Sequence, residues 1–460
     1  MRRKGITMVF RELEKSNWVS GFGYNYYTAA QLERHIIKRT EDALETGDAK
    51  RAGITDLHSF ETRRNAMRKE FIDRMGGLPV MDTPLNPVHT GDVRGNGFTI
   101  EKIIFESRPG IYVTCNLYRL DRLTGRRPAV IFTSGHFNEA KAADEYQTAC
   151  QYFMQAGFVV LAMDPTGQGE RATYYEKDLK RESIRMGTMD HNATGFMCLP
   201  LGQSIMRYFV HDIMRAYDYL AGRPDVDKDK ICVTGNSGGG TQTALAMICD
   251  TRIAAAAPAT WITNRRAYLY AGQTQDMEQL WCGISAYGFD HEDAMYMTAP
   301  KPTVLLAAAY DFFPVEGVKE NYHNTKRFWE YYGEPDNYQL LITQEKHMYS
   351  PEMAKFTASF FLSKLTGETA EFDDGAIVLF PVKQLECTKS GQAKGDFTGA
   401  RTVFDDNLDT SAALADSRRA AAVGQRDVLY VNQRQIGRKY VVQGRRVRQV
   451  GKIDQERVEF

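Results

Sequence analysis

The stretch that decides the fold is residues 231–240, ICVTGNSGGG. A short β-type run leads to Ser237, which glycines flank, and a helix-capable segment over residues 241–249 follows at once. Strand, sharp turn and helix in this order are typical of a nucleophile elbow with the pattern G-x-S-x-G. The strained turn needs glycine at 235 and 239, because a side chain there would press against the neighbouring strand or helix. We therefore expect an α/β fold with Ser237 as its nucleophile.

An acid and a histidine follow two later apolar runs of the buried-strand type. The run over residues 303–309 ends at Tyr310-Asp311, and His347 comes shortly after residues 338–343. The chain order Ser, Asp, His is that of α/β-hydrolases and differs from that of chymotrypsin or subtilisin. Sites in open α/β sheets form outside the carboxyl ends of the strands, so these groups can converge. Glu316 is a rival acid, but Asp311 lies closer to the strand end and is preferred.

These three residues predict covalent catalysis on a carbonyl. A serine hydroxyl is a poor nucleophile near neutral pH, so an imidazole has to take its proton as the attack begins. We expect His347 to do this and then to return the proton to the leaving alcohol. Asp311 would fix the tautomer of the imidazole and stabilise the imidazolium.

An oxyanion hole should complete this site. Its first donor is expected to be the backbone N–H of Gly238, the residue after the nucleophile. The second should come from residues 134–138, the loop after an apolar run over residues 128–133. We assign it to His136, with Phe137 as the alternative, and the donor is the main-chain amide in either case.

Residues 75–366 resemble the α/β-hydrolase superfamily, in the bacterial branch of acetyl xylan esterase-like and prolyl oligopeptidase-like hydrolases. The resemblance implies a mostly parallel central sheet with an antiparallel opening hairpin, helices on both faces and lid insertions. After about residue 367 the pattern changes, which indicates a small C-terminal appendage. The motifs that carry the resemblance are Ser134-Gly135-His136, Asp164-Pro165-Thr166-Gly167-Gln168-Gly169-Glu170-Arg171, Gly235-Asn236-Ser237-Gly238-Gly239, and Asp311-Phe312-Phe313-Pro314 with His347.

Two long insertions are expected to face the substrate, residues 174–201 and residues 258–299. The second holds Trp261 and Trp281, whose rings suit the faces of sugars, and Glu278, a candidate polar contact. A tryptophan in a long insertion can equally serve to pack that insertion onto the domain, so both interpretations stay open.

The expected reaction is ester hydrolysis on acylated carbohydrate, foremost deacetylation. A methyl-ester hydrolase on uronic-acid glycans is the first alternative, because Arg171 and other cations could meet the acid groups of neighbouring sugars. A prolyl oligopeptidase-like peptidase is disfavoured, since about 95 residues before the first hairpin cannot hold a β-propeller. A noncatalytic carbohydrate-binding protein would have no need of the full set of Ser237, Asp311 and His347.

Composition limits the partners. The formal net charge is zero, so nothing favours nucleic acid, and no apolar run approaches the roughly 20 residues that span a bilayer. We expect no membrane, no cofactor and no metal site, because His191 and His291 lack the spacing of metal ligands. A homo-oligomer is left open. The N-terminus does not resemble a signal peptide, which indicates a cytoplasmic protein as the sequence is written, or an exported or periplasmic one if it is a mature form.

The sequence divides into three parts. Residues 1–90 are expected to form a helical lead-in, residues 91–366 the catalytic domain, and residues 367–460 an appendage whose role we do not assign. Short strands are expected in the appendage at 378–380 and 384–388. A hairpin is expected from Tyr430-Val431 and Tyr440-Val441-Val442.

Overall fold

A computed structural model describes residues 30–272, 275–418, 440–443 and 446–449. The chain forms two compact units, Met1–Val403 and Phe404–Phe460. The first unit extends beyond residue 366, where the sequence places the end of the catalytic domain. Within the described residues, no helix is long and apolar enough to cross a membrane.

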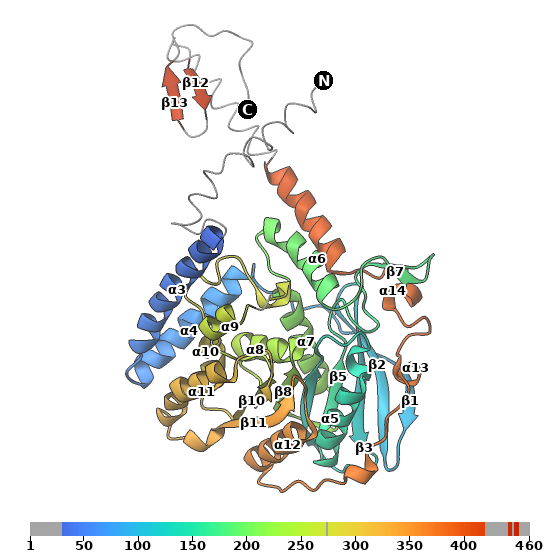
Figure 1. Ribbon diagram of the computed structural model, residues 1–460. Coiled ribbons are helices and arrows are strands. Elements are labelled where there is room, and N and C mark those ends of the chain that lie inside the picture. The colour runs from blue at the N-terminus through green and yellow to red at the C-terminus, as the bar shows by residue number, and fades with distance from the viewer. Residues whose placement is uncertain (1–29, 273–274, 419–439, 444–445, 450–460) are drawn as a thin grey trace, which may run out of the picture. The chain divides into compact units, whose positions relative to one another are not determined.

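A nine-stranded sheet forms the centre of the first unit (Figure 1). Its order is β1-β2-β3-β5-β4-β8-β9-β10-β11. The strands from β5 to β11 in this order run parallel, whereas β1, β2 and β3 pair antiparallel. The bounds are β1 Val88–Arg94, β2 Phe98–Arg108, β3 Ile111–Leu120, β4 Arg127–Thr133, β5 Val159–Met163, β8 Val226–Asn236, β9 Ala256–Ala259, β10 Thr303–Tyr310 and β11 Tyr338–Lys346.

Helices cover both faces of this sheet and create two separate apolar cores. One core contains side chains from α4, α7, α8, α10 and α11, and the other contains those from α5 and α12. The helices are α3 Gln31–Ala52, α4 Leu57–Arg74, α5 Asp144–Gln155, α6 Thr188–Cys198, α7 Met206–Ala221, α8 Gly238–Cys249, α9 Arg265–Ala271, α10 His291–Met295, α11 Val315–Glu330, α12 Pro351–Thr366, α13 Val382–Leu385 and α14 Ala393–Asp396.

The central strands are buried on both faces because their sequences are almost continuously apolar. Every residue of β5 is buried, as are the last six of β4 and the first six of β10. Near-continuous apolar runs are what a parallel sheet covered on both sides requires. The predicted fold class is confirmed, including the antiparallel hairpin, which forms from β2 and β3.

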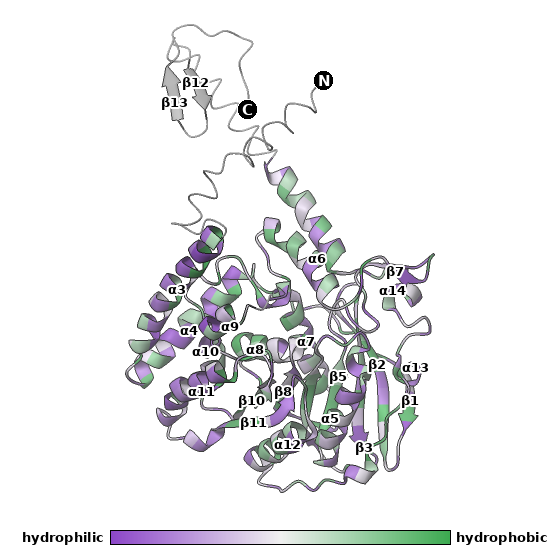
Figure 2. Cartoon of the chain, viewed as in Figure 1, coloured by the Kyte–Doolittle hydropathy of each residue, from purple (hydrophilic) through white to green (hydrophobic). Residues whose placement is uncertain are grey.

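The N-terminal helices are part of the first unit. Asp56 caps α4 by accepting a hydrogen bond from the Ser59 N–H, and the helix buries Phe60, Met67 and Phe71 in the core shared with α7 and α8. Most of α3 is hydrophilic (Figure 2). The lead-in is therefore exposed along much of α3 and firmly docked along one side of α4.

Residues 367–403 run along the first unit without a strand. Backbone groups at residues 378 and 380 bond the side chains of Gln151 and Gln147 on α5. The Cys387 and Thr388 N–H groups donate to the buried Glu170 carboxylate. The strands expected at 378–380 and 384–388 are therefore wrong: the backbone satisfies its hydrogen bonds on side chains, and α13 occupies part of the second stretch.

The second unit is described over residues 404–418, which are helical, and over a hairpin. The hairpin pairs β12 Tyr440–Gln443 antiparallel with β13 Arg446–Gln449. The predicted strand at Tyr440-Val441-Val442 is confirmed, although its partner is β13. Tyr430-Val431, the expected partner, lies outside the described residues.

Candidate active site

Ser237 occupies a sharp turn between β8 and α8. Its backbone has φ 57° and ψ −117°, a region that a residue with a side chain enters only when its surroundings impose it. The constraint comes from β9 and the residue after it: the Ser237 N–H donates to the Ala259 carbonyl oxygen at 3.0 Å and to Thr260 Oγ1 at 3.1 Å. The elbow geometry predicted from the sequence is therefore present.

The two glycines of the pattern are needed for space. A Cβ atom at Gly235 would lie 2.2 Å from the Thr133 carbonyl oxygen, and one at Gly239 would lie 2.1 Å from the same atom. Thr133 ends β4, the strand beside β8. Because the obstacle is backbone in the middle of the sheet, neither position can accept a side chain without moving a strand.

Asp311 and His347 form a hydrogen-bonded pair at the ends of β10 and β11. The imidazole Nδ1 lies 2.8 Å from Asp311 Oδ1 and 2.9 Å from Oδ2. The Asp311 side chain is only 2% exposed, whereas that of His347 is 23% exposed. Asp311 Oδ1 also accepts the Phe313 N–H at 3.1 Å. Glu316, the rival acid, is exposed in the first turn of α11.

The parallel strands bring this pair to the sheet edge that carries Ser237. Ser237 follows β8, and Asp311 and His347 follow β10 and β11, which all run in one direction. No hydrogen bond joins Ser237 Oγ to His347 in the part of the chain that the structure describes. Catalytic hydrogen bonds are often long in sites without substrate and tighten when it binds.

The loop after β4 lies directly against the nucleophile. A Cβ atom at Gly135 would lie 3.1 Å from Ser237 Cβ, and the Gly135 N–H is held by the Tyr146 hydroxyl at 3.0 Å. Gln168 Nε2 donates to the carbonyl oxygens of Gly135 and Phe137, each at 2.8 Å. Gln168, from the sequence motif after β5, thereby holds the loop that the sequence assigns to the oxyanion hole.

A cluster of the half-buried His136 with the buried His191 and Glu278 adjoins Gly238. His136 Nε2 and His191 Nδ1 each lie 2.6 Å from a different oxygen of Glu278. Burial opposes charge on Glu278 and on His136. The two imidazoles nevertheless hold the pKa of Glu278 well below its usual range, and Glu278 raises the pKa of His136. A Cβ atom at Gly238 would lie 2.8 Å from His136 Cε1.

This cluster connects both predicted insertions to the oxyanion loop. His191 belongs to α6 in the first insertion, Glu278 to a 3-10 turn, Met277–Gln279, in the second, and His136 to the loop after β4. One ligand atom from each lies within 4.8 Å of the others, a set that could hold a metal ion. The sequence spacing gave no such indication, because the three residues meet only through the fold.

The remaining candidate substrate contacts lie inside the domain. Trp261 is 4% exposed and stacks on His291 at 4.1 Å between ring centroids, and Trp281, also 4% exposed, packs edge-on against Phe71. Arg171 donates to the Asp164 carbonyl oxygen and forms a buried ion pair with Asp212. Packing thus accounts for the positions of both tryptophans, and a structural ion pair accounts for that of Arg171.

An open cavity lies beside the oxyanion loop. Its volume is about 320 Å³ and His136, Phe137, Arg185 and Met186 are among its lining residues. Arg185 is exposed, and it gives this cavity a cation that the sequence analysis did not single out. The cavity is open enough to admit a sugar ring.

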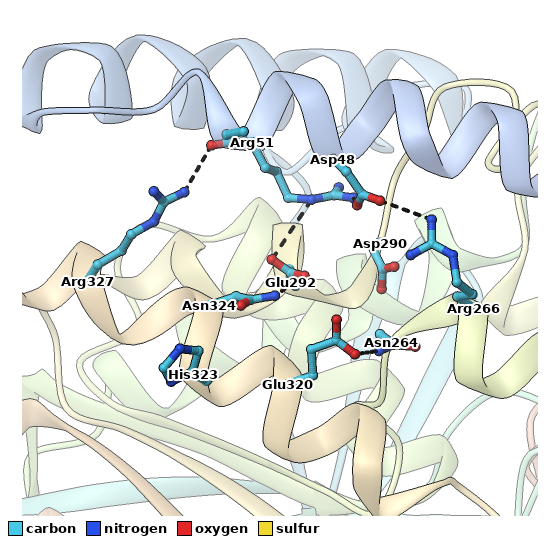
Figure 3. A pocket seen from close by; sticks show the side chains of 11 residues that line it. Asp48, Arg51, Asn264, Arg266, Asp290, Glu292, Glu320, His323, Asn324 and Arg327 are labelled. Atoms are coloured by element: carbon cyan, nitrogen blue, oxygen red, sulfur yellow. Dashed lines mark hydrogen bonds and ion pairs between the residues drawn. The ribbon is translucent and has the colours of Figure 1, made fainter.

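A second cavity, of about 390 Å³, lies between α3, α9 and α11 and has none of the predicted catalytic residues in its lining (Figure 3). Several of its charged groups pair with one another, as Arg266 does with Asp48 and Arg51 with Glu292. Burial raises the pKa of Asp290 to about 6 and that of Glu292 to about 7, although Arg51 opposes both shifts. The cavity is a polar seam that joins α3 to the domain.

Residues 83–268 match the family model of the acetyl xylan esterases, a region that contains Ser237 and the oxyanion loop. The chain is also 24% identical over 255 residues to a protein of Bacillus subtilis (strain 168) named "Putative hydrolase YtaP", a match that covers 52% of this chain and 79% of that protein.

Solved structures share the fold at low sequence identity. Methylesterase BT1017 is 20% identical, with a TM-score of 0.63 over 82% of this chain and 81% of that one. A glucuronoyl esterase from Solibacter usitatus is 15% identical, with a TM-score of 0.54 over 68% of this chain and 94% of that one. Fold and family match agree with the predicted resemblance. They identify the chain as a carboxylic ester hydrolase of the α/β-hydrolase fold, similar to the acetyl xylan esterases over residues 83–268.

Proposed function

We propose that this enzyme removes acetyl groups from acylated carbohydrate through an acyl-enzyme intermediate on Ser237. The observation that carries the proposal is the strained Ser237 backbone at the same sheet edge as the hydrogen-bonded pair of His347 and Asp311. A positive φ at serine has an energetic cost, and such strain concentrates at functional sites. The family match over residues 83–268 supports the acetyl group as the acyl part.

Each residue has one chemical task in this proposal. His347 takes the Ser237 proton on Nε2 as Oγ attacks the ester carbonyl, and it then protonates the leaving sugar oxygen. Asp311 accepts the Nδ1 hydrogen, which keeps Nε2 free to act as the base. The Gly238 N–H and an amide of the loop at His136 stabilise the oxyanion. Water then attacks the acetyl carbonyl while His347 takes its proton. His347 returns that proton to Ser237 Oγ as acetate is released.

The test is acetate release from acetylated xylo-oligosaccharides, compared between the wild-type protein and Ser237→Ala. We expect turnover in the wild type and a loss of about 10⁴-fold or more in the variant, as for removal of other serine nucleophiles. Acetate release that persists in Ser237→Ala would refute the assignment of the nucleophile. A wild-type protein that releases no acetate from any glycan would refute the acetyl proposal.

Arg185 favours a second candidate, hydrolysis of methyl esters on uronic-acid glycans. This exposed cation lines the cavity beside the oxyanion loop, where it could pair with the free carboxylate of a neighbouring sugar. The structural likeness to a methylesterase and to a glucuronoyl esterase makes this class worth assaying. The test is methanol release from partly methylated oligouronates by wild type and Arg185→Gln. A rise in KM confined to the charged substrate supports this candidate, and wild-type activity on acetyl esters alone refutes it.

A further inference from the structure

The cluster of His136, His191 and Glu278 has a feature that an ion pair does not explain. His136 Nε2 and Glu278 Oε1 lie 2.6 Å apart, yet both atoms are buried without a hydrogen-bond partner, because the ring N–H does not point at the oxygen. The Glu278 side chain is 1% exposed. Buried polar atoms generally have a hydrogen-bond partner, whereas these two face one another across a contact that lacks hydrogen-bond geometry.

His191, the third member of the cluster, is already oriented as a metal ligand would be. His191 Nε2 lies 2.9 Å from the Thr166 carbonyl oxygen, which can only accept, so Nε2 carries a hydrogen. Histidines that bind metals generally donate their second ring N–H to a carbonyl or carboxylate oxygen, which fixes the tautomer. The other ring nitrogen, Nδ1, lies 2.6 Å from Glu278 Oε2, so it would face a metal ion bound beside that oxygen.

We propose that His136 Nε2, His191 Nδ1 and the Glu278 carboxylate bind one divalent transition-metal ion, with Zn²⁺ as the best match. Two histidines and one glutamate are a ligand set of catalytic zinc sites, which keep a further position open. Two ligands at about 2.1 Å from a tetrahedral zinc are about 3.4 Å apart. Both contacts of 2.6 Å to Glu278 would therefore open by less than about 1 Å.

The charge of the site suits such an ion. Two neutral imidazoles and the Glu278 carboxylate leave one negative charge, and the carboxylate of Asp276 lies close enough for the two acids to interact. The ion would also sit beside the elbow, because the space next to Gly238 Cα is bounded by His136 Nε2 at 3.0 Å and Glu278 Oε1 at 3.1 Å from an added Cβ. It would thus put positive charge next to the first oxyanion donor. Binding itself does not depend on the proposed esterase activity.

Metal binding is measured directly on the purified full chain, without a histidine tag and after treatment with a chelator. Titration with ZnCl₂ in a calorimeter and elemental analysis after dialysis should give about one zinc per chain. Binding should be accompanied by proton release that depends on pH, because histidine and carboxylate groups bind a metal only through deprotonated atoms. Co²⁺ in place of Zn²⁺ should produce visible d–d absorption, and Zn²⁺ should raise Tm.

Glu278→Gln and His191→Asn should each weaken binding by about tenfold or more. The matched control is His211→Asn, which removes a buried imidazole outside the cluster, and it should bind zinc as the wild type does. Ser237→Ala should also retain zinc, which separates this inference from the esterase proposal. If the cluster variants fail to fold, the Co²⁺ spectrum and the proton release of the wild-type protein still show whether the metal binds. A wild type that takes up no zinc and gives no Co²⁺ spectrum, or folded cluster variants that bind like the wild type, would overturn the proposal.

Discussion

Replacing Asp311 with asparagine should nearly abolish activity without disturbing the fold. The Asp311 oxygens lie 2.8 and 2.9 Å from His347 Nδ1, and Oδ1 also accepts the Phe313 N–H. In Asp311→Asn the Phe313 N–H favours the amide oxygen at the Oδ1 position. The amide NH₂ then occupies the Oδ2 position and faces Nδ1 at about 2.9 Å, a normal donor–acceptor distance.

Two donors cannot face one another at that distance, so the imidazole moves its hydrogen to Nε2. In this tautomer Nε2 has no lone pair to accept the Ser237 proton, and the imidazolium also loses its countercharge. The same exchange in a serine protease lowers kcat about 10⁴-fold, which corresponds to about 5.5 kcal/mol of transition-state stabilisation. We expect a loss of similar size here.

The assay is steady-state release of p-nitrophenol from its acetate ester, followed for wild type, Asp311→Asn and Glu316→Gln. Glu316 is the matched control, since it is an exposed acid close in sequence to Asp311, and its variant should keep wild-type kcat. Thermal melts should show that both variants fold. A loss below about tenfold in Asp311→Asn, or a larger loss in Glu316→Gln, would show that the wrong acid has been assigned.

Three further predictions concern the stability of the fold that positions the site. Gly239→Ala places a Cβ 2.1 Å from the Thr133 carbonyl oxygen and should cost about 1–3 kcal/mol of stability or more; an unchanged Tm would contradict the tight elbow. Phe60→Ala removes a fully buried ring of α4 and should lower the free energy of unfolding by about 3–5 kcal/mol, measured by chemical denaturation. The control is Leu32→Ala, at a side chain on α3 that is 71% exposed, and it should leave the free energy of unfolding nearly unchanged. Equal effects of the two variants would mean that α4 is not docked. Burial raises the Glu292 pKa to about 7 in the folded state, so the folded protein binds more protons than the unfolded one and stability falls as pH rises from about 4.5 to 7. Glu292→Gln should flatten this fall between pH 5 and 8 in melts at several pH values, and an unaltered slope would refute the assignment.

Local sequence pattern predicted the catalytic strands well. The runs before Ser237, Asp311 and His347 are apolar and end at polar residues or glycine, and each is a parallel strand that ends near the predicted position. The G-x-S-x-G pattern predicted the elbow correctly. Both of its glycines are needed because a Cβ atom at either position would clash with the Thr133 carbonyl oxygen. The strands and the elbow depend on residues that are close together in the sequence. They could therefore be predicted from one sequence alone.

Contacts between residues that are far apart in the sequence could not be predicted from local sequence pattern. His191 and Glu278 are 87 positions apart and meet only because two insertions fold over the same loop. Within residues 367–403 the short apolar runs wrongly predicted strands, because the backbone there bonds side chains such as Gln147 and Glu170. The sequence analysis treated Arg171 as a cation available to substrate. In the structure it pairs with the buried Asp212, which lies on α7, 41 positions away.

The central claim is that Ser237 forms the covalent intermediate, and labelling tests it most directly. The folded protein is incubated with a fluorophosphonate, which reacts with activated serines, and the intact mass and the modified peptide are determined. We predict one adduct per chain on Ser237, with labelling lost in Ser237→Ala and strongly slowed in His347→Gln, because the imidazole activates the hydroxyl. An unlabelled wild-type protein that still hydrolyses esters, or an adduct on another residue, would contradict the account.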